Sequence, residues 1–233
     1  MAIEGLVRKW LKGDRPDLGA RAATQALELA DYDALIKERE IYTGFREETS
    51  QEAGVFKTIL ADKYETLPPT LLALHNDTEA TWRGKASIKS ARNPLAKLIA
   101  LSAGVNVKAG DDIPLTVSFK TDEHGELWTR NFDGQDFHNH FSLGTGRNTH
   151  LAVERFGLFK IGIALVIKEN KLHYIPRRCT LFGIPFPKAL LPTGESFEVE
   201  KNGRFHFSVM IKLPILGRMA AYKGWLEPED NPS

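Results

Sequence analysis

Residues 126–143, ELWTRNFDGQDFHNHFSL, carry a clear pattern of secondary structure. On both sides of a polar Asp-Gly-Gln link, large apolar residues recur at alternate positions. This period of two is typical of a β-strand with one buried face, and so short a link joins antiparallel neighbours. The stretch therefore predicts a β-hairpin.

The same pattern runs through the second half of the chain, from residue 113 onward. Short polar connectors rich in Gly, Asn and Asp separate its strands, and an earlier strand is expected around Trp82. About nine sequential antiparallel strands twist too strongly to remain flat. We expect a strongly curved, barrel-like meander built from IPLTVSF, ELWTRNF, DFHNHFSL, HLAVERF, FKIGIALVI, KLHYIPRR, SFEVE, RFHFSVMI and GRMAAYKGWL.

The first half of the chain reads mainly as helix, and the change falls near residue 112. NPLAKLIALSAG has Asn93 as a cap, Pro94 in the first turn and Gly104 past the end. Further helices are expected in LADYDALIKER, EAGVFKTILADKY and LPPTLLALH. The fold class is therefore α+β, with helices covering one face of the sheet or plugging one end.

The first residues form an amphipathic pattern whose apolar stripe is Ile3, Leu6, Val7, Trp10 and Leu11. This pattern predicts a helix and not a signal peptide. We expect residues 1–55 to form an appendage that packs through this stripe, with no cofactor site in residues 1–50, and residues 56–233 to form the sheet domain with its covering helices.

Composition excludes several classes of protein. The 233 residues carry a net charge of +1, so the chain as a whole has no electrostatic attraction to nucleic acid or to an anionic membrane. A local basic patch is still compatible with this net charge. A single cysteine excludes an internal disulfide. The longest apolar run, residues 156–167, is too short for a membrane span and contains Lys160. We expect a soluble, cytoplasmic protein.

Three histidines are the candidate metal ligands. Strand alternation places His138 and His140 together on the polar face, and His206 lies on the polar face of its own strand. A catalytic zinc site needs three protein ligands, so His206 would have to lie beside the other two. Solvated histidines are the simpler interpretation, and we assign no metal.

No other motif specifies a reaction. GTGRNT, residues 144–149, lacks the third glycine and the following helix of a dinucleotide-binding loop, so it is expected to be a strand connection. Ser142 and Ser208 lie in no nucleophile motif, and Cys179 is expected in the core. We therefore predict no catalytic residue and no cofactor.

The candidate ligand-binding residues are Trp128, Arg130, Phe132 and Glu154. The first three share one strand face, where burial would place the Arg130 guanidinium beside aromatic rings and require a partner. Glu154 also lies among apolar neighbours. Two interpretations stay open, a structural pair between Arg130 and Glu154, or contact with the head group of an anionic ligand.

Residues 64–227 resemble the bacterial family known as domain of unknown function 4166. The resemblance is carried by LPPTLLALH, WRGKASI, NPLAKLIA, IPLTVSF, LWTRNFDG, VERFG, FGIPFPKALLP, FHFSVMIKLPILG and YKGWL, in that order. The family implies no activity, but it is often joined behind a saccharopine-reductase-like NAD(P) oxidoreductase region. The segment GDRPDLGARAATQALELADYDALIKEREIYTGFREE resembles the tail of such a region.

Three functions remain open from the sequence. The favoured one is a non-catalytic module that binds an apolar or amphiphilic small molecule within its curved sheet. The second is an enzyme, either a hydrolase using the three histidines or an accessory part of an oxidoreductase, as domain or subunit. The third is a purely structural or interaction domain.

Overall fold

The computed structural model describes residues 2–14, 27, 31–32, 54–76, 79–102, 104 and 108–229. The chain divides into two compact units, Met1–Arg46 and Glu47–Ser233. In the first, helix α1 (Ala2–Leu11) confirms the helix expected at the N-terminus. The helix expected in LADYDALIKER lies almost wholly outside the described residues. The packing of the N-terminal stripe remains a prediction.

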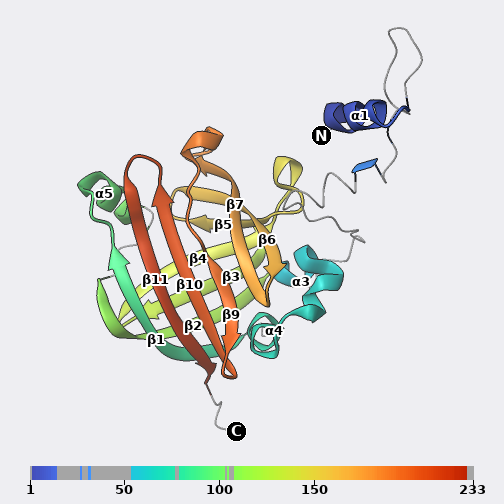
Figure 1. Cartoon of the computed structure of the whole chain (residues 1–233). Coiled ribbons are helices and arrows are strands. Elements are labelled where there is room, and N and C mark those ends of the chain that lie inside the picture. Colours follow the sequence, from blue (N-terminus) through green and yellow to red (C-terminus); the bar gives the residue numbers. More distant parts are fainter. Residues whose placement is uncertain are drawn as a thin grey trace. The chain divides into compact units, whose positions relative to one another are not determined.

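The second unit is a closed antiparallel barrel of ten strands (Figure 1). These are the nine strands expected from residue 113 onward plus the one expected around Trp82. A two-residue strand, β8 (Ile184–Pro185), pairs outside the ring with β7 and was not expected. The barrel strands are β1 (Thr81–Ser90), β2 (Gly110–Asp122), β3 (Gly125–Phe132), β4 (Gln135–Leu143), β5 (Ala152–Phe156), β6 (Phe159–Lys168), β7 (Lys171–Leu181), β9 (Phe197–Lys201), β10 (Arg204–Leu213) and β11 (Gly217–Pro228).

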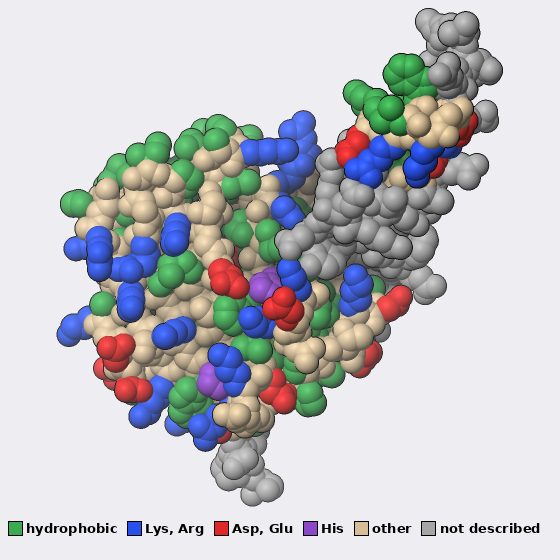
Figure 2. All heavy atoms as spheres, in the orientation of Figure 1, with side chains coloured by type: hydrophobic (Ala, Val, Ile, Leu, Met, Phe, Trp, Pro, Cys, Tyr) green, Lys and Arg blue, Asp and Glu red, His purple; other side chains and the backbone are tan. Residues whose placement is uncertain are grey.

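Two features close the ring. Strand β1 pairs with its sequence neighbour β2 on one side and with the distant β11 on the other, while β6 and β7 pair along their whole lengths. At the β1–β11 seam the backbones approach so closely that a Cβ on Gly84 would lie 1.9 Å from the Trp225 carbonyl oxygen. Charged side chains lie on the outer surface of the barrel (Figure 2), and apolar side chains fill much of the interior.

Three short helices plug one end of the barrel. They are α3 (Val55–Leu60), the 3-10 helix η1 (Ala61–Thr66) and α4 (Pro69–Asn76), which leads directly into β1. Phe56, Tyr64, Leu71 and Leu74 on these helices are buried. Helix α3 contacts β4, β5 and β6, and α4 contacts β9 and β10. The expectation that helices plug one end is confirmed.

Helix α5 (Pro94–Ser102) lies at the opposite end, between the end of β1 and the start of β2. The Asn93 side-chain oxygen accepts hydrogen bonds from the backbone N–H groups of Leu95 and Ala96. Gly104 follows the helix with a φ of 74°. The predicted cap, first-turn proline and terminal glycine are all confirmed, and α5 packs on β11 through Ala100.

Candidate ligand-binding site

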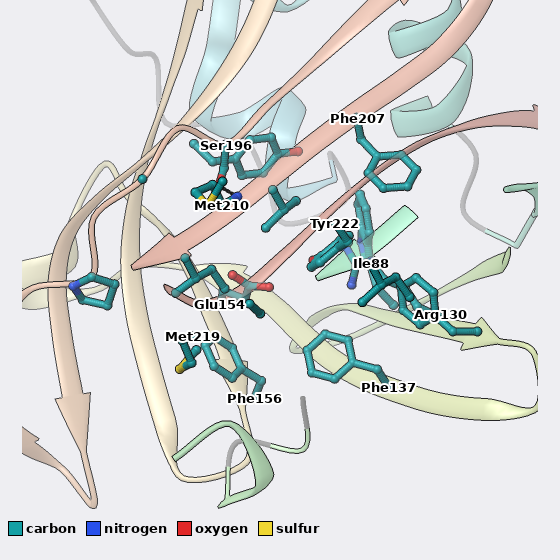
Figure 3. Close-up of a pocket in the computed structure, with 18 of the residues that line it drawn as sticks. Ile88, Arg130, Phe137, Glu154, Phe156, Ser196, Phe207, Met210, Met219 and Tyr222 are labelled. Atoms are coloured by element: carbon teal, nitrogen blue, oxygen red, sulfur yellow. Dashed lines mark hydrogen bonds between the residues drawn. The ribbon is translucent and has the colours of Figure 1, made fainter. Parts of the chain in front are cut away.

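A cavity of about 450 Å³ lies inside the barrel. Its walls are mainly apolar and aromatic, and its lining residues come from all ten barrel strands. Figure 3 shows Phe137, Glu154, Phe207 and Tyr222 projecting toward this space from different strands. Leu74 on α4 closes it at the plugged end. At the other end the exposed residues Lys97, Lys108 and Thr193 line it, so the cavity reaches the surface there.

The four candidate residues from the sequence all line this cavity. Arg130 on β3 and Glu154 on β5 stand on either side of β4, and Asn139 on β4 joins them. An Arg130 guanidinium N–H donates to the Asn139 side-chain oxygen, while Asn139 Nδ2 donates to Glu154 Oε1 at 2.8 Å. Arg130 and Glu154 are therefore coupled through an amide.

Aromatic rings flank the guanidinium. Its carbon lies 5.0 Å from the Trp128 ring centroid and 5.9 Å from that of Phe137, the cross-strand partner of Arg130. Phe132 contacts Tyr222 edge to face, with centroids 5.8 Å apart. An arginine that stacks on rings and keeps N–H donors free can bind a carboxylate or hydroxyl inside an apolar pocket.

The three candidate histidines are not brought together. His138 and His140 on β4 point to the outside of the barrel, where they contact Thr129 and Asp122. His206 on β10 also faces outward, and four strands separate β4 from β10 in either direction around the ring. Among the described residues, no three His, Cys, Asp or Glu side chains are grouped to hold a metal ion.

The GTGRNT segment is a strand connection between β4 and β5, as expected. It contains the 3-10 helix η2 (Gly146–Asn148), and Gly146 has a φ of 58°. Gly144 is needed for a different reason, since a Cβ there would lie 2.0 Å from the Asn148 carbonyl oxygen. Cys179 is buried, as expected, and burial raises the pKa of its thiol to about 11.

Comparison with known proteins places this barrel in a family. The model of the family described as Domain of unknown function (DUF4166) matches residues 67–226. The chain belongs to this family. The match begins just before α4, after the first two plug helices, and ends in the last strand, so the DUF4166 region contains nearly the whole barrel with its cavity. The segment of residues 13–48, which was expected from its sequence to resemble an oxidoreductase tail, lies outside the match. No curated protein matches the chain, and no solved structure does.

Sequence reasoning missed several polar residues of the DUF4166 barrel. Alternation with Phe137 and Phe141 puts Asn139 on the inward face of β4, but its role as a bridge was not foreseen. Tyr222 on β11 also lines the cavity, and burial raises the pKa of its hydroxyl, which keeps it a hydrogen-bond donor. A polar residue at an inward-facing position of an alternating strand is the signal that could have found both.

A second polar group lies at the floor of the cavity. Glu198 on β9 accepts a hydrogen bond from the Tyr174 hydroxyl at 2.7 Å and lies 2.7 Å from His75 Nε2 on α4. The buried Nδ1 atom of His75 has no hydrogen-bond partner among the described residues. The Nε2–H tautomer therefore suits this site, because it donates to Glu198 and leaves Nδ1 without a proton. This contact fastens the plug to the barrel wall.

Glu154 predicts a pH dependence of stability. Burial raises the pKa of its carboxyl above the usual 4.5, although Arg130 and Asn139 oppose this. Between 4.5 and the raised value the folded protein holds a proton that the unfolded chain has released. Through this group, stability therefore falls as the pH rises across that window. Urea unfolding of Glu154→Gln at a series of pH values should show a weaker decline than the wild type, whereas Glu123→Gln at an exposed site should retain it.

Within the described residues, no helix has the length and apolar character needed to cross a membrane.

Proposed function

We propose that this DUF4166 barrel is a non-catalytic module that binds an elongated, mostly apolar small molecule in its interior. The observation that carries the proposal is the 450 Å³ cavity with apolar walls and a few convergent polar groups. Ligand pockets commonly have volumes of about 300–1,000 Å³ and this mixture of lining groups. Ten strands also enclose more width than the eight that side chains alone can fill.

The polar groups indicate an amphiphilic ligand. Trp128 and Phe132 supply apolar surface for its body. The hydroxyl of Tyr222 and the N–H donors of Arg130 that do not bind Asn139 supply partners for a carboxylate or hydroxyl, and Glu154 supplies an acceptor. Because Asn139 couples Arg130 to Glu154, the guanidinium is held in place before a ligand arrives, which lowers the entropy cost of binding.

We also propose that the binding unit spans residues 56–233 together with Val55, which begins plug helix α3 and is buried, and that residues 1–54 are an appendage. The cavity-lining residues all fall between Leu74 and Leu226, which supports this division. Resemblance of the appendage to an oxidoreductase tail supports such a domain or subunit as a partner.

Mass spectrometry of small molecules extracted from the purified protein tests the proposal. We expect an amphiphile to co-purify with the wild type. The same amphiphile should displace the dye 1-anilinonaphthalene-8-sulfonate from the protein. Arg130→Ala should reduce recovery by about tenfold or more by removing the charged hydrogen-bond donor. Ala220→Phe, which places a ring in the cavity, should reduce recovery and dye binding together.

The control is Arg83→Ala, at an exposed arginine on the outer face of β1. It should leave recovery unchanged, and circular dichroism should show all three variants folded. If no molecule co-purifies and the dye binds wild type and Ala220→Phe equally, the cavity is not a binding site. A structural domain or an oxidoreductase accessory would then be favoured.

A further inference from the structure

The open end of the barrel carries an unusual concentration of exposed apolar side chains. All eight large hydrophobic side chains that are exposed among the described residues of the barrel unit lie in connections at this end. We call them the apolar rim. Its members are Leu95, Leu98, Leu101, Leu158, Phe182, Ile184, Leu190 and Ile215.

Barrel topology explains why these residues share one end. Connections of an up-and-down barrel alternate between its two ends. The β1–β2, β5–β6, β7–β9 and β10–β11 connections therefore lie together, opposite the plug. In Figure 2, hydrophobic side chains gather along the upper left margin of the barrel, where Figure 1 places α5 and the β10–β11 turn.

Two rim residues occupy backbone positions that disfavour them. Phe182 has a φ of 53° and is 69% exposed, while Ile215 has a φ of 69° and is 95% exposed. Positive φ is strained for bulky and especially β-branched residues and suits Asn or Gly. Neither side chain offsets this strain by burial within the protein. A contact outside the protein would supply the missing burial.

Helix α5 shows the same outward display. Leu95, Leu98 and Leu101 recur every third residue and form an exposed stripe, while Ala96 and Ala100 on the other face are buried. A surface helix normally presents polar residues to water. Residues 91–109, which contain α5, carry Arg92, Lys97 and Lys108 and no acidic residue. The outward face of this connection is therefore both apolar and cationic.

We propose that the apolar rim docks on the surface of a bilayer that contains anionic lipid. Side chains that project from helix and turn tips can enter the region between headgroups and acyl chains, and nearby Lys and Arg attract anionic headgroups. The cavity opens within this rim, beside Lys97 and Lys108, so docking would set its mouth against the lipid. Docking of the rim does not depend on whether the cavity holds a ligand.

Vesicle co-sedimentation with the full chain tests the proposal. We expect the protein to sediment with phosphatidylcholine–phosphatidylglycerol vesicles, less with phosphatidylcholine alone, and less as salt rises. The double variant Phe182→Asn/Ile215→Asn should lose about tenfold or more in partitioning. Its thermal stability should be unchanged or higher, because asparagine suits positive φ. If the variant is as stable as the wild type or more stable but binds vesicles less, its weaker binding cannot be due to unfolding.

Charge reversal provides a matched control. Lys97→Glu/Lys108→Glu beside the cavity mouth should weaken binding to the mixed vesicles, whereas Lys201→Glu/Lys223→Glu elsewhere on the barrel should leave it unchanged. The proposal is overturned if wild type fails to bind either vesicle, or if the rim variants bind as well as wild type. Self-association that the double variant abolishes, without vesicle binding, would identify the rim as a protein interface instead.

The cavity variant Ala220→Phe distinguishes this inference from the proposed function. It should retain vesicle binding even though it loses the small-molecule ligand, because Ala220 lies inside the barrel and not on the rim.

Discussion

Asn139→Leu is expected to lower the free energy of unfolding by about 2–5 kcal/mol. Asn139 is 2% exposed. Its side-chain oxygen accepts a hydrogen bond from Arg130, and its side-chain nitrogen donates one to Glu154. Leucine has a similar size but neither group, so both charged side chains would lose a partner inside the barrel. Urea unfolding measures the loss.

Two further variants serve as controls for Asn139→Leu. Asn131→Leu makes the same change at a half-buried site on β3, where water can replace the bonds to Asp136 and to the Gly134 N–H, and should change stability by about 1 kcal/mol or less. The triple variant Arg130→Met/Asn139→Leu/Glu154→Met removes both charges and should recover most of the loss. If Asn139→Leu is as stable as wild type, the amide is not a necessary bridge.

Phe56→Ala should destabilise the barrel by about 3–5 kcal/mol. Phe56 is fully buried in the plug and stacks on His75 with ring centroids 4.0 Å apart. It also meets Trp128 at 5.6 Å and Phe141 at 5.5 Å on the barrel wall. Its removal would leave a void between plug and wall and loosen the floor of the cavity. Thermal and urea unfolding measure the effect.

Phe182→Ala is the matched control, since it deletes the same side chain at a site that is 69% exposed. It should change stability by less than about 1 kcal/mol. Equal effects from the two variants would mean that the plug contributes no packing energy to the barrel.

Much of the fold could be predicted because local patterns specify it. Alternation set the inward face of each strand, and Asn93 with Gly104 marked the two ends of α5. Strand twist predicted a barrel-like sheet, but the strand pair that closes the ring could not be predicted. Closure depends on β1 meeting β11, which lies more than a hundred residues later, and no local pattern of residues specifies that pairing.

The site was predicted less completely for the same reason. Trp128, Arg130 and Phe132 share a strand, so their common face follows from their spacing. The partner of Glu198 is His75, which is 123 residues away in sequence. Cavity size depends on how side chains from ten strands fill the interior, and this is a property of packing that strand alternation does not determine.

The β1–β11 seam also has a consequence for the order of folding. Each pair of neighbouring strands in the ring is also consecutive along the barrel sequence, except β1 and β11. One edge of β1 therefore stays unpaired until β11 has been synthesised. During translation the incomplete sheet therefore exposes two unpaired edges, which can recruit strands from other chains. Closure also requires contacts of long sequence separation, and such contacts slow folding. Chaperone dependence and aggregation should therefore concentrate in chains interrupted before residue 217.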